Sequence, residues 1–572
     1  MIRLDGDSLT IEQLAQIARD PAARVARDPR TNERVAKSEA LIADVVERYR
    51  NGSGATEYGV TTGFGEFKDK PIAPADLEQL QRNLLLSHSV GFGQNSDPDD
   101  MANYYAPEVV RGALATRLNA FLKGHSGVRT KLVDIVEAML NRGVIPLVPL
   151  RGSVGASGDL CPLSHLFAVL LGEGRYYMLD DVGRGSARPD GLNPVLRPAA
   201  ELPELLGFTK EELAPTFKEG LALVNGANFS AAMLALAVYD AERLAATADT
   251  CAALAIEALS GCTRALDGKV HEARGQLGQI ESARRIREQL GGSRLVERAG
   301  AVQDPYSLRC APQVHGASLD AIRYARTVAE RELNAATDNP LFFPEGGEPF
   351  DLTFRANWPE WYRGSERLAY SAGNFHGQPL ALAADFLTIA VSELANISER
   401  RTQLMLDGHL NRNLPNNLTT RPGVNSGLMI AQYTAASIVS ENKVLAHPAS
   451  VDSIPTGANT EDHVSMSTHA ARKLRTVIDN TRAVLAIELM VAAQAVEWRV
   501  ATLSGVIARP QTLEEAEEQA AAFASFLQNA DAASWLGSGT RAAYQQVRSA
   551  AAPVLKDRPL DGDIRALLAQ LA

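Results

Sequence analysis

The sequence predicts a mainly α-helical protein built around a bundle of long helices. Aromatic residues make up only 6% of the 572 residues, while alanine, leucine and glutamate are abundant. Alternating apolar and polar runs, which are typical of strands, are few. Apolar residues instead recur at helical spacing over segments that approach or exceed about 25 residues, and such lengths suit a helix bundle.

The first part of the chain, residues 1–205, is predicted to be a smaller domain of shorter helices. Thr10 and Gln13 have the spacing of a capping box at the start of the first helix. The segment 51–65 holds five glycines and no helical period, which indicates a tightly turned loop. Helical patterning resumes over 76–90 and again over 107–142.

Residues 143–165 contain the most unusual string of the sequence. A Pro-punctuated apolar run is followed by GSVGASGDL at 152–160. A helix is expected to begin near Asp159, an N-cap candidate, and to continue through LSHLFAVLLGEG. Residues 174–205 show little periodicity and are predicted to form a surface excursion.

Residues 206–510 are predicted to form the central bundle, and residues 511–572 a set of short amphipathic C-terminal helices. The clearest long helices are expected at 229–259, 380–406, 427–445 and 464–506. Their many small residues allow helices to pack closely.

Composition and charge exclude several classes of protein. The net charge of −11 provides no basic field for nucleic acid or for an anionic membrane. The four cysteines are too few for a disulfide framework and none has CxxC spacing. Asp5 and Asp7 stand where a signal peptide would be basic, and no stretch reaches the ~18 uncharged apolar residues of a membrane span. We therefore expect a cytoplasmic protein with no membrane or nucleic-acid partner.

Three kinds of chemistry fit the string at 152–160. Glycines before a helix could bind phosphate, but no GxxxxGK[ST] pattern is present. Ser157 could be a nucleophile, although GASGD is not the GxSxG elbow. Alternatively, the Gly158 nitrogen could attack the Ala156 carbonyl and, after dehydration of Ser157, close an electrophilic five-membered ring, because tiny residues let the backbone bend sharply.

The surrounding motifs resemble those of one family. GSVGASGDLCPLSH is similar to the hallmark of the aromatic amino acid ammonia-lyase and aminomutase family, whose members include histidine, tyrosine and phenylalanine ammonia-lyases. Further matches run from about residue 50 to 500 in the family's order: YGVTTGFG (58–65), QRNLLLSH (81–88), EGLALVNG (219–226), VQDPYSLRC (302–310), GNFHGQP (373–379) and ASVDSIPTGANTEDHVSM (449–466).

The resemblance implies a fold, a prosthetic group and an assembly. The fold would be the long-helix bundle of the aromatic amino acid lyases, which is fumarase/aspartase-like, with a smaller N-terminal part. That part would carry 4-methylidene-imidazol-5-one (MIO) made from Ala156, Ser157 and Gly158, so no external cofactor and no metal is expected. The family forms homotetramers in which three chains build each active site.

The family's motifs also assign roles to single residues. Tyr58 would be the base that removes the β-proton, from a lid loop near 51–70. A free tyrosine titrates near ~10, so this role requires a depressed pKa or a proton that leaves in concert. Arg309 would clamp the substrate carboxylate, and Tyr306 would act as an acid or an orienting hydroxyl. The other residues at family binding positions are Gly65, Asn225, Gln303 and Phe375.

Two sites in the sequence indicate which amino acid is the substrate. Ser87-His88 resembles the selectivity pair of histidine ammonia-lyases and of some tyrosine aminomutases, because an imidazole can hydrogen-bond an imidazole or a phenol. Glu461 matches the histidine-lyase glutamate, whose carboxylate can accept from the substrate ring N–H. By themselves Glu461, Asp462 and His463 could be a metal cluster, but three adjacent residues cannot share one helical face. L-histidine deamination to urocanate is therefore the favoured reaction.

Other features keep alternatives open. His376-Gly377-Gln378-Pro379 replaces the HAEP-like string of typical histidine lyases, Ala311 stands where many have Gln, and His315 departs from the subgroup patterns. These departures leave a tyrosine, phenylalanine or substituted aryl-alanine lyase, or an aromatic 2,3-aminomutase, as alternatives. The GSSxMPxKxN signature of the fumarase–aspartase superfamily is absent. A non-enzymatic scaffold would be expected to lack an intact Ala-Ser-Gly triad or the base. In this chain Ala156, Ser157, Gly158 and Tyr58 are all present.

Overall fold

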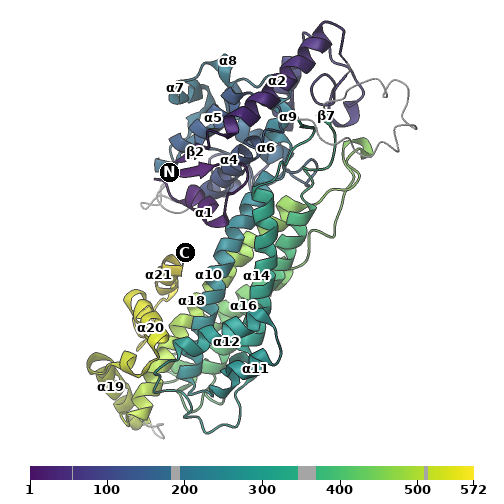
Figure 1. Ribbon diagram of the computed structural model, residues 1–572. Coiled ribbons are helices and arrows are strands. Elements are labelled where there is room, and N and C mark those ends of the chain that lie inside the picture. Colours follow the sequence, from purple (N-terminus) through teal and green to yellow (C-terminus); the bar gives the residue numbers. More distant parts are fainter. Residues whose placement is uncertain (55, 182–193, 345–368, 508–512, 572) are drawn as a thin grey trace. The chain divides into compact units, whose positions relative to one another are not determined.

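The computed structural model of the chain describes residues 1–54, 56–181, 194–344, 369–507 and 513–571 (Figure 1). Helices dominate these residues, and the strands among them are at most four residues long, which confirms the predicted mainly α class. Ala55 of the expected lid loop and residues 182–193 of the expected surface excursion lie outside the described residues.

The chain divides into two compact units. The first unit comprises residues 1–239, 326–384 and 448–472, and the second comprises residues 240–325, 385–447 and 473–572. Each unit therefore combines segments that are distant in the sequence. The division at residues 205 and 510 expected from the sequence stays a prediction.

The first unit holds the shorter helices. They are α1 (Ile11–Arg19), α2 (Thr31–Arg50), α3 (Leu77–His88), α4 (Pro107–Phe121), α5 (Thr130–Arg142), α6 (Leu160–Ala168), α7 (Leu202–Leu206), α8 (Lys210–Leu213) and α9 (Glu219–Val224). The capping box predicted at α1 is confirmed. The Gln13 amide N–H donates to Thr10 Oγ1 at 3.2 Å and the Thr10 amide N–H donates to Gln13 Oε1 at 3.0 Å.

The helical patterning over 107–142 corresponds to two helices, α4 and α5, which are separated by residues 122–129. Gly124 and Gly127 both adopt a positive φ, at +77° and +66°. A β-carbon at Gly127 would lie 2.5 Å from Ile42 of α2, and one at Gly124 would lie 2.7 Å from Arg34. The chain breaks here because the turn needs glycine in the left-handed region and passes close to α2.

Three small sheets accompany these helices. β1 (Ile2–Leu4) and β2 (Val25–Arg27) pair in parallel with Ile2 opposite Val25. β3 (Val144–Pro146), β4 (Arg175–Met178) and β5 (Arg197–Pro198) form an antiparallel sheet in that order. β6 (Leu341–Phe342) pairs antiparallel with β7 (Ala369–Tyr370). Five residues, 147–151, separate the end of β3 from the 152–160 string.

All four long helices predicted for the bundle are present. They are α10 (Asn228–Ala258), α16 (Gln378–Leu406), α17 (Met429–Leu445) and α18 (Ser467–Leu503), and α14 (Ala311–Leu333) joins them. The unit boundaries fall within α10, α14, α16 and α18. In the second unit these four helices run side by side (Figure 1). Most of their alanines and leucines are buried, which is the close packing that small residues allow.

Shorter helices complete the second unit. They are α11 (Gly268–Glu272), α12 (Leu277–Gln289), α13 (Tyr306–Arg309), α19 (Leu513–Asn529), α20 (Ser538–Ala550) and α21 (Asp561–Leu571). The last three confirm the short C-terminal helices predicted from the sequence.

His315 lies inside the second unit and is fully buried among charged groups. Arg401 NH1 lies 3.3 Å from His315 Nε2, and His315 Nδ1 lies 2.8 Å from Asp249 Oδ1. Since arginine has only donors, Nε2 accepts and the Nδ1–H donates to Asp249. Arg401 also donates from NH2 to Glu488 Oε2 at 2.8 Å. His315 is therefore a hydrogen-bonded core residue that links α10, α14, α16 and α18.

One helix of the described chain, α16, is long and apolar enough to cross a membrane by length and composition. Of its most apolar window, 67% is buried inside the protein. The core helix of a bundle passes the same test, so this finding is weak support for a membrane span.

Candidate active site

A pocket of about 770 Å³ lies in the first unit. It is bordered by the 58–72 loop, α3, the 152–161 string, α9 and the segment 456–461. Eight residues that the sequence singled out line it: Tyr58, Gly65, Ser87, His88, Ala156, Ser157, Asn225 and Glu461. The fold thus gathers motifs that are up to about 400 residues apart along the chain around one cavity.

The 156–158 triad sits in a tight turn before α6. The Gly158 amide N–H donates to the Gly155 carbonyl at 3.2 Å. Gly155, Ser157 and Gly158 have φ of +84°, +48° and +84°. A positive φ is uncommon for a serine and places strain at the centre of the triad. Ser153 Oγ ties the turn together, because it accepts from the Gly155 N–H at 3.1 Å and donates to the Gly158 carbonyl at 3.3 Å.

The turn packs directly against the backbone that follows α9. A β-carbon at Gly158 would lie 2.3 Å from the Gly226 carbonyl carbon, so only glycine fits there. The Gly226 N–H donates to the Ser157 carbonyl at 3.0 Å, and the Asp159 N–H donates to the Gly226 carbonyl at 2.8 Å. Gly226 therefore holds the backbone on both sides of Gly158.

The helix after the turn begins at Leu160, as predicted, but the expected role of Asp159 is wrong. Its carboxylate makes no cap hydrogen bond to α6. It accepts instead from the Ser230 amide at 2.8 Å and the Ser230 hydroxyl at 2.9 Å, and also from the Thr468 hydroxyl. Burial raises the pKa of Asp159, which these hydrogen bonds lower in part. Asp159 thus ties the turn to α10 and α18 rather than capping its own helix.

Tyr58 lies between the Gly65 backbone and Glu461. The Gly65 amide N–H points at Tyr58 Oη across 3.5 Å. Burial raises the pKa of Tyr58 above its usual value of 10.0, and the Glu461 carboxylate raises it further, while the Gly65 amide lowers it. The protein environment alone therefore does not supply the depressed pKa that a base needs near neutrality.

Glu461 folds back over a strained turn beside Tyr58. Gly457 has a φ of +52°, and any β-carbon there would overlap the Glu461 carboxylate. The Thr456 N–H donates to the Glu461 carbonyl at 3.0 Å. A β-carbon at Gly65 would lie 3.3 Å from Glu461 Oε1. Glycines at 65 and 457 thus leave room for the carboxylate to enter the pocket.

The predicted selectivity pair lies at the end of α3. Ser87 Oγ is 3.0 Å from His88 Nδ1, so the hydroxyl helps to fix the imidazole ring. Burial lowers the pKa of His88 below its usual 6.5, which keeps the imidazole neutral near neutral pH.

Asn225, at the end of α9, is buried beside the triad. Its Oδ1 has no hydrogen-bond partner within the described part of the chain. A buried amide oxygen without a partner is costly unless a ligand or group satisfies it. This orphaned atom, the turn at 156–158 and the close glycine packing fit a group built from the triad.

The remaining predicted residues do not line this pocket. Phe375 belongs to the first unit, whereas Gln303, Tyr306 and Arg309 belong to the second. Tyr306 is 70% exposed. The Arg309 guanidinium lies over the Tyr306 ring, 4.6 Å from its centroid, and Arg309 Nε has no partner among the described residues.

His165 is a residue beside the pocket that sequence reasoning did not single out. Its Nε2 accepts from the Gly91 N–H at 2.9 Å. Cys161, one helical turn earlier on α6, lines the pocket and packs against Gly152. Their i, i+4 spacing on one face of α6 is the signal that could have found them together.

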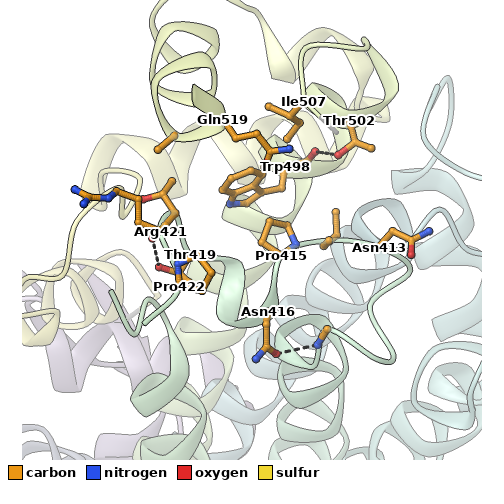
Figure 2. A pocket seen from close by; sticks show the side chains of 14 residues that line it. Asn413, Pro415, Asn416, Thr419, Arg421, Pro422, Trp498, Thr502, Ile507 and Gln519 are labelled. Carbon is orange, nitrogen blue, oxygen red and sulfur yellow. Dashed lines mark hydrogen bonds between the residues drawn. The ribbon is translucent and has the colours of Figure 1, made fainter. Parts of the chain in front are cut away.

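A second pocket, of about 280 Å³, lies in the second unit (Figure 2). The Trp498 indole ring lies in the middle of its labelled side chains and donates from Nε1 to the Leu418 carbonyl at 3.1 Å. Among the described residues that line it, Arg421 alone is ionisable, and it pairs with Glu517 at 3.1 Å. The described residues that line this pocket therefore include no carboxylate, histidine, lysine or cysteine.

The helical fold and the gathered motifs define an aromatic amino acid lyase. Residues 9–526 match the family described as "Aromatic amino acid lyase". The chain belongs to this family and is a carbon–nitrogen lyase.

The chain is 46% identical to the histidine ammonia-lyase of Caldanaerobacter subterraneus subsp. tengcongensis over 87% of this chain and 88% of that one. The crystal structure of histidine ammonia-lyase from Trypanosoma cruzi is 35% identical, with a TM-score of 0.78 over 100% of this chain and 93% of that one. Tyrosine aminomutase from Streptomyces globisporus is 32% identical, with a TM-score of 0.80 over 100% and 96% of the two chains.

Replacing His165 with Gln tests the electrostatics beside the pocket. Burial lowers the pKa of His165 from 6.5 to about 4. The unfolded chain therefore binds a proton below pH 6.5 that the folded protein takes up only near pH 4, so acidification through this window favours unfolding. Gln offers Oε1 to the Gly91 N–H but does not titrate. We expect the wild type to lose about 2 kcal/mol more unfolding free energy than His165→Gln between about pH 7.5 and about pH 5, in urea denaturation at one protein concentration. Equal losses would show that His165 is not buried as a neutral acceptor.

Proposed function

We propose that this enzyme eliminates ammonia from L-histidine to give urocanate, with MIO formed from Ala156, Ser157 and Gly158. The observation that carries the proposal is that one pocket in the first unit joins Tyr58, Ala156 and Ser157 to His88 and Glu461. The 46% identity to a histidine ammonia-lyase over most of both chains supports the substrate.

The residues of the turn fit the proposed group. The ring would supply an electrophile that captures the substrate amine and makes it a better leaving group. The chain's own part is to hold the triad. The Gly226 N–H lies on the Ser157 carbonyl, which would become the ring carbonyl, and would withdraw electron density from it. Asn225, whose Oδ1 is otherwise unpartnered, would support the ring or the substrate carboxylate.

Tyr58 is proposed to remove the β-proton. Burial and Glu461 keep the Tyr58 phenol protonated. The phenol proton must therefore leave in concert with removal of the β-proton, or after a positive charge arrives beside Oη. The ammonium of a bound amino acid brings such a charge, and the Gly65 N–H adds a donor that favours the phenolate. Gly65 and its neighbours in the 51–70 loop would act as the lid.

Glu461 and His88 are proposed to hold the substrate's imidazole ring. The carboxylate can accept from a ring N–H, and the neutral His88 can exchange one hydrogen bond with the ring. Ser87 orients His88 through the 3.0 Å contact at Nδ1. A phenyl ring would leave both groups unsatisfied, which disfavours it.

The carboxylate clamp is proposed to come from other copies of the chain in a homotetramer. Arg309, with Tyr306 and Gln303, would bind the carboxylate and provide an acid, and Phe375 would pack near the ring and substrate. Exposed apolar side chains on helices of the second unit support self-association. They are Tyr324, Phe386, Ile389, Ile430 and Tyr433. We also propose a cytoplasmic location and no nucleic-acid or membrane partner.

A second candidate is a tyrosine, phenylalanine or substituted aryl-alanine lyase, or an aromatic 2,3-aminomutase. The string His376-Gly377-Gln378-Pro379 and the 32% identity to a tyrosine aminomutase favour it. In this string Gln378 donates to the Ser450 carbonyl at 3.3 Å, and its Oε1 is buried with no partner among the described residues. Lyase and mutase differ in whether ammonia escapes or re-adds at the β-carbon.

Intact mass spectrometry tests the prosthetic group. We expect the wild type to weigh less than its sequence by two water molecules, because ring closure and serine dehydration each release one. Ser157→Ala should lose the methylidene and nearly all activity. Ser164→Ala, which changes another buried serine nearby on α6, should retain both. An unmodified wild-type mass would refute the central proposal.

Replacing Glu461 with Gln tests substrate choice. The loss of a charge-assisted hydrogen bond should lower kcat/KM for L-histidine by about 10- to 100-fold, corresponding to about 1.5–3 kcal/mol. Activity on L-tyrosine and L-phenylalanine should not fall in parallel. Asp462→Asn removes the adjacent exposed carboxylate and should leave kcat/KM unchanged. If wild type turns over L-tyrosine well and L-histidine poorly, or forms a β-amino acid detectable by NMR, the second candidate replaces the first.

Mixed tetramers test whether one site draws on several chains. Tyr58→Phe and Arg309→Met should each be nearly inactive, yet their co-expression should restore activity at up to about a quarter of the sites, since random mixing leaves that fraction with both native residues. Tyr58→Phe mixed with Ser157→Ala is the control, because these two residues line the same pocket of one chain. That pair should restore no activity. Failure of the first pair would assign Tyr58 and Arg309 to one chain.

A further inference from the structure

The backbone at Gly226, which hydrogen-bonds the triad, is in turn held by a buried arginine, Arg117. Gly226 is packed between two layers. On one side it contacts Gly158 of the triad, and on the other a β-carbon would lie 2.8 Å from Arg117 NH1 and 2.5 Å from the Thr337 carbonyl. Gly226 has a φ of +142°, so glycine is required for conformation as well as for space.

Arg117 binds both ends of the Gly226 segment, which runs from Ala222 to Asn228. This residue of α4 is 0% exposed. Its NH2 donates to the Ala222 carbonyl in α9, at one end of the segment, and its NH1 lies 3.2 Å from Asn228 Oδ1, at the start of α10 and the other end of the segment. NH1 also donates to the Thr337 carbonyl at 2.6 Å. A planar guanidinium can make such divergent hydrogen bonds at once, which a lysine ammonium on a flexible stem cannot reproduce.

A second buried cation completes this brace of the Gly226 segment. Asp338 Oδ2 lies 3.4 Å from Arg117 NH2 and 2.6 Å from Lys218 Nζ. Lys218 is 0% exposed and adopts a φ of +65° at the start of α9. Burial lowers the pKa of Arg117 to about 10 and that of Lys218 to about 8, and Asp338 opposes both shifts. Two cations thus share one buried carboxylate directly behind the Gly226 segment.

We propose that Arg117, anchored by Asp338 and Lys218, is a positioning residue for closure of the Ala156-Ser157-Gly158 ring. The inference rests on the proposed function, because it assigns a role in making the proposed group. Arg117 does not touch the triad. It acts through Gly226, whose N–H and carbonyl hold Ser157 and Asp159, the residues on either side of the attacking Gly158.

The covalent chemistry that the brace serves needs no co-reactant. The Gly158 nitrogen bonds to the Ala156 carbonyl carbon, and the carbonyl oxygen leaves as water with the hydrogens of the Gly158 and Ser157 nitrogens. The Ser157 Cα–H and its Cβ hydroxyl then leave as a second water. The Gly226 N–H on the Ser157 carbonyl would stabilise the negative charge that develops as the Cα proton departs. A displaced Gly226 would slow both steps.

Arg117→Lys tests the proposal, with Arg111→Lys as the matched control. Arg111 lies on the same helix, is 1% exposed, and donates to the Ile17 and Leu140 carbonyls, away from Gly226. The measurements are the intact mass of folded protein at successive times after refolding, the melting temperature, and kcat per dehydrated chain. We expect Arg117→Lys to lose water at least tenfold more slowly than wild type, and Arg111→Lys to match wild type at a similar melting temperature. Because the Gly226 N–H would also act on the formed ring, the rate of water loss tests the proposal and kcat per dehydrated chain is read separately.

Each outcome decides the proposal. Full, rapid dehydration of Arg117→Lys overturns it, and so does equal slowing in Arg111→Lys, which would show a general folding effect. Absence of water loss in the wild type overturns the proposed function itself, so the two failures are distinguishable. If Arg117→Lys does not fold, Asn228→Ala removes one acceptor of Arg117 and leaves the ion pairs of Asp338 with Arg117 and Lys218 in place. Slower dehydration in folded Asn228→Ala supports the brace, and unchanged dehydration refutes it.

Discussion

The packing of Gly158 against Gly226 is the constraint on which the rest of the candidate site depends. A β-carbon at 158 would lie 2.3 Å from the Gly226 backbone, and one at 226 would lie 2.5 Å from the Thr337 carbonyl, so neither position can carry a side chain without moving a neighbouring segment. Two hydrogen bonds then fix the register, one into Ser157 and one from Asp159. The positive φ of Ser157 is held from both sides, so the strain at the triad persists only because the surrounding structure over-determines it.

The same burial that holds the triad sets the protonation of its neighbours. Desolvation raises the pKa of Tyr58 and lowers that of His88, so both favour their neutral forms. Glu461 thus shares one pocket with a neutral phenol and a neutral imidazole. A carboxylate in such surroundings favours a ligand that carries a positive charge or a polarised N–H. An amino acid with an ammonium group and an imidazole ring offers both, which agrees with the choice of histidine over a plain aryl side chain.

Local signals made much of this fold predictable. The capping box at Thr10, the long apolar helices and the start of α6 follow from residues a few positions apart, and the structure bears them out. The break at 122–129 was missed because its cause is the approach of Arg34 and Ile42, nearly 90 residues away. Asp159 failed as a cap for the same reason, since Ser230 and Thr468 compete for its carboxylate. Motifs located the pocket, but the raised pKa of Tyr58 depends on burial that no motif reports.

The buried charges behind Gly226 are hard to explain as a source of stability. Removing arginine, lysine and aspartate side chains from water is costly, and apolar residues of similar volume often serve a core as well or better. One carboxylate between two cations also leaves an excess of positive charge in the interior. Geometry provides the better reason, because an apolar side chain cannot bind the Ala222 and Thr337 carbonyls and the Asn228 amide at once. The fold thus tolerates the desolvation cost of burying Arg117 where the backbone beside the strained turn has to keep a fixed position.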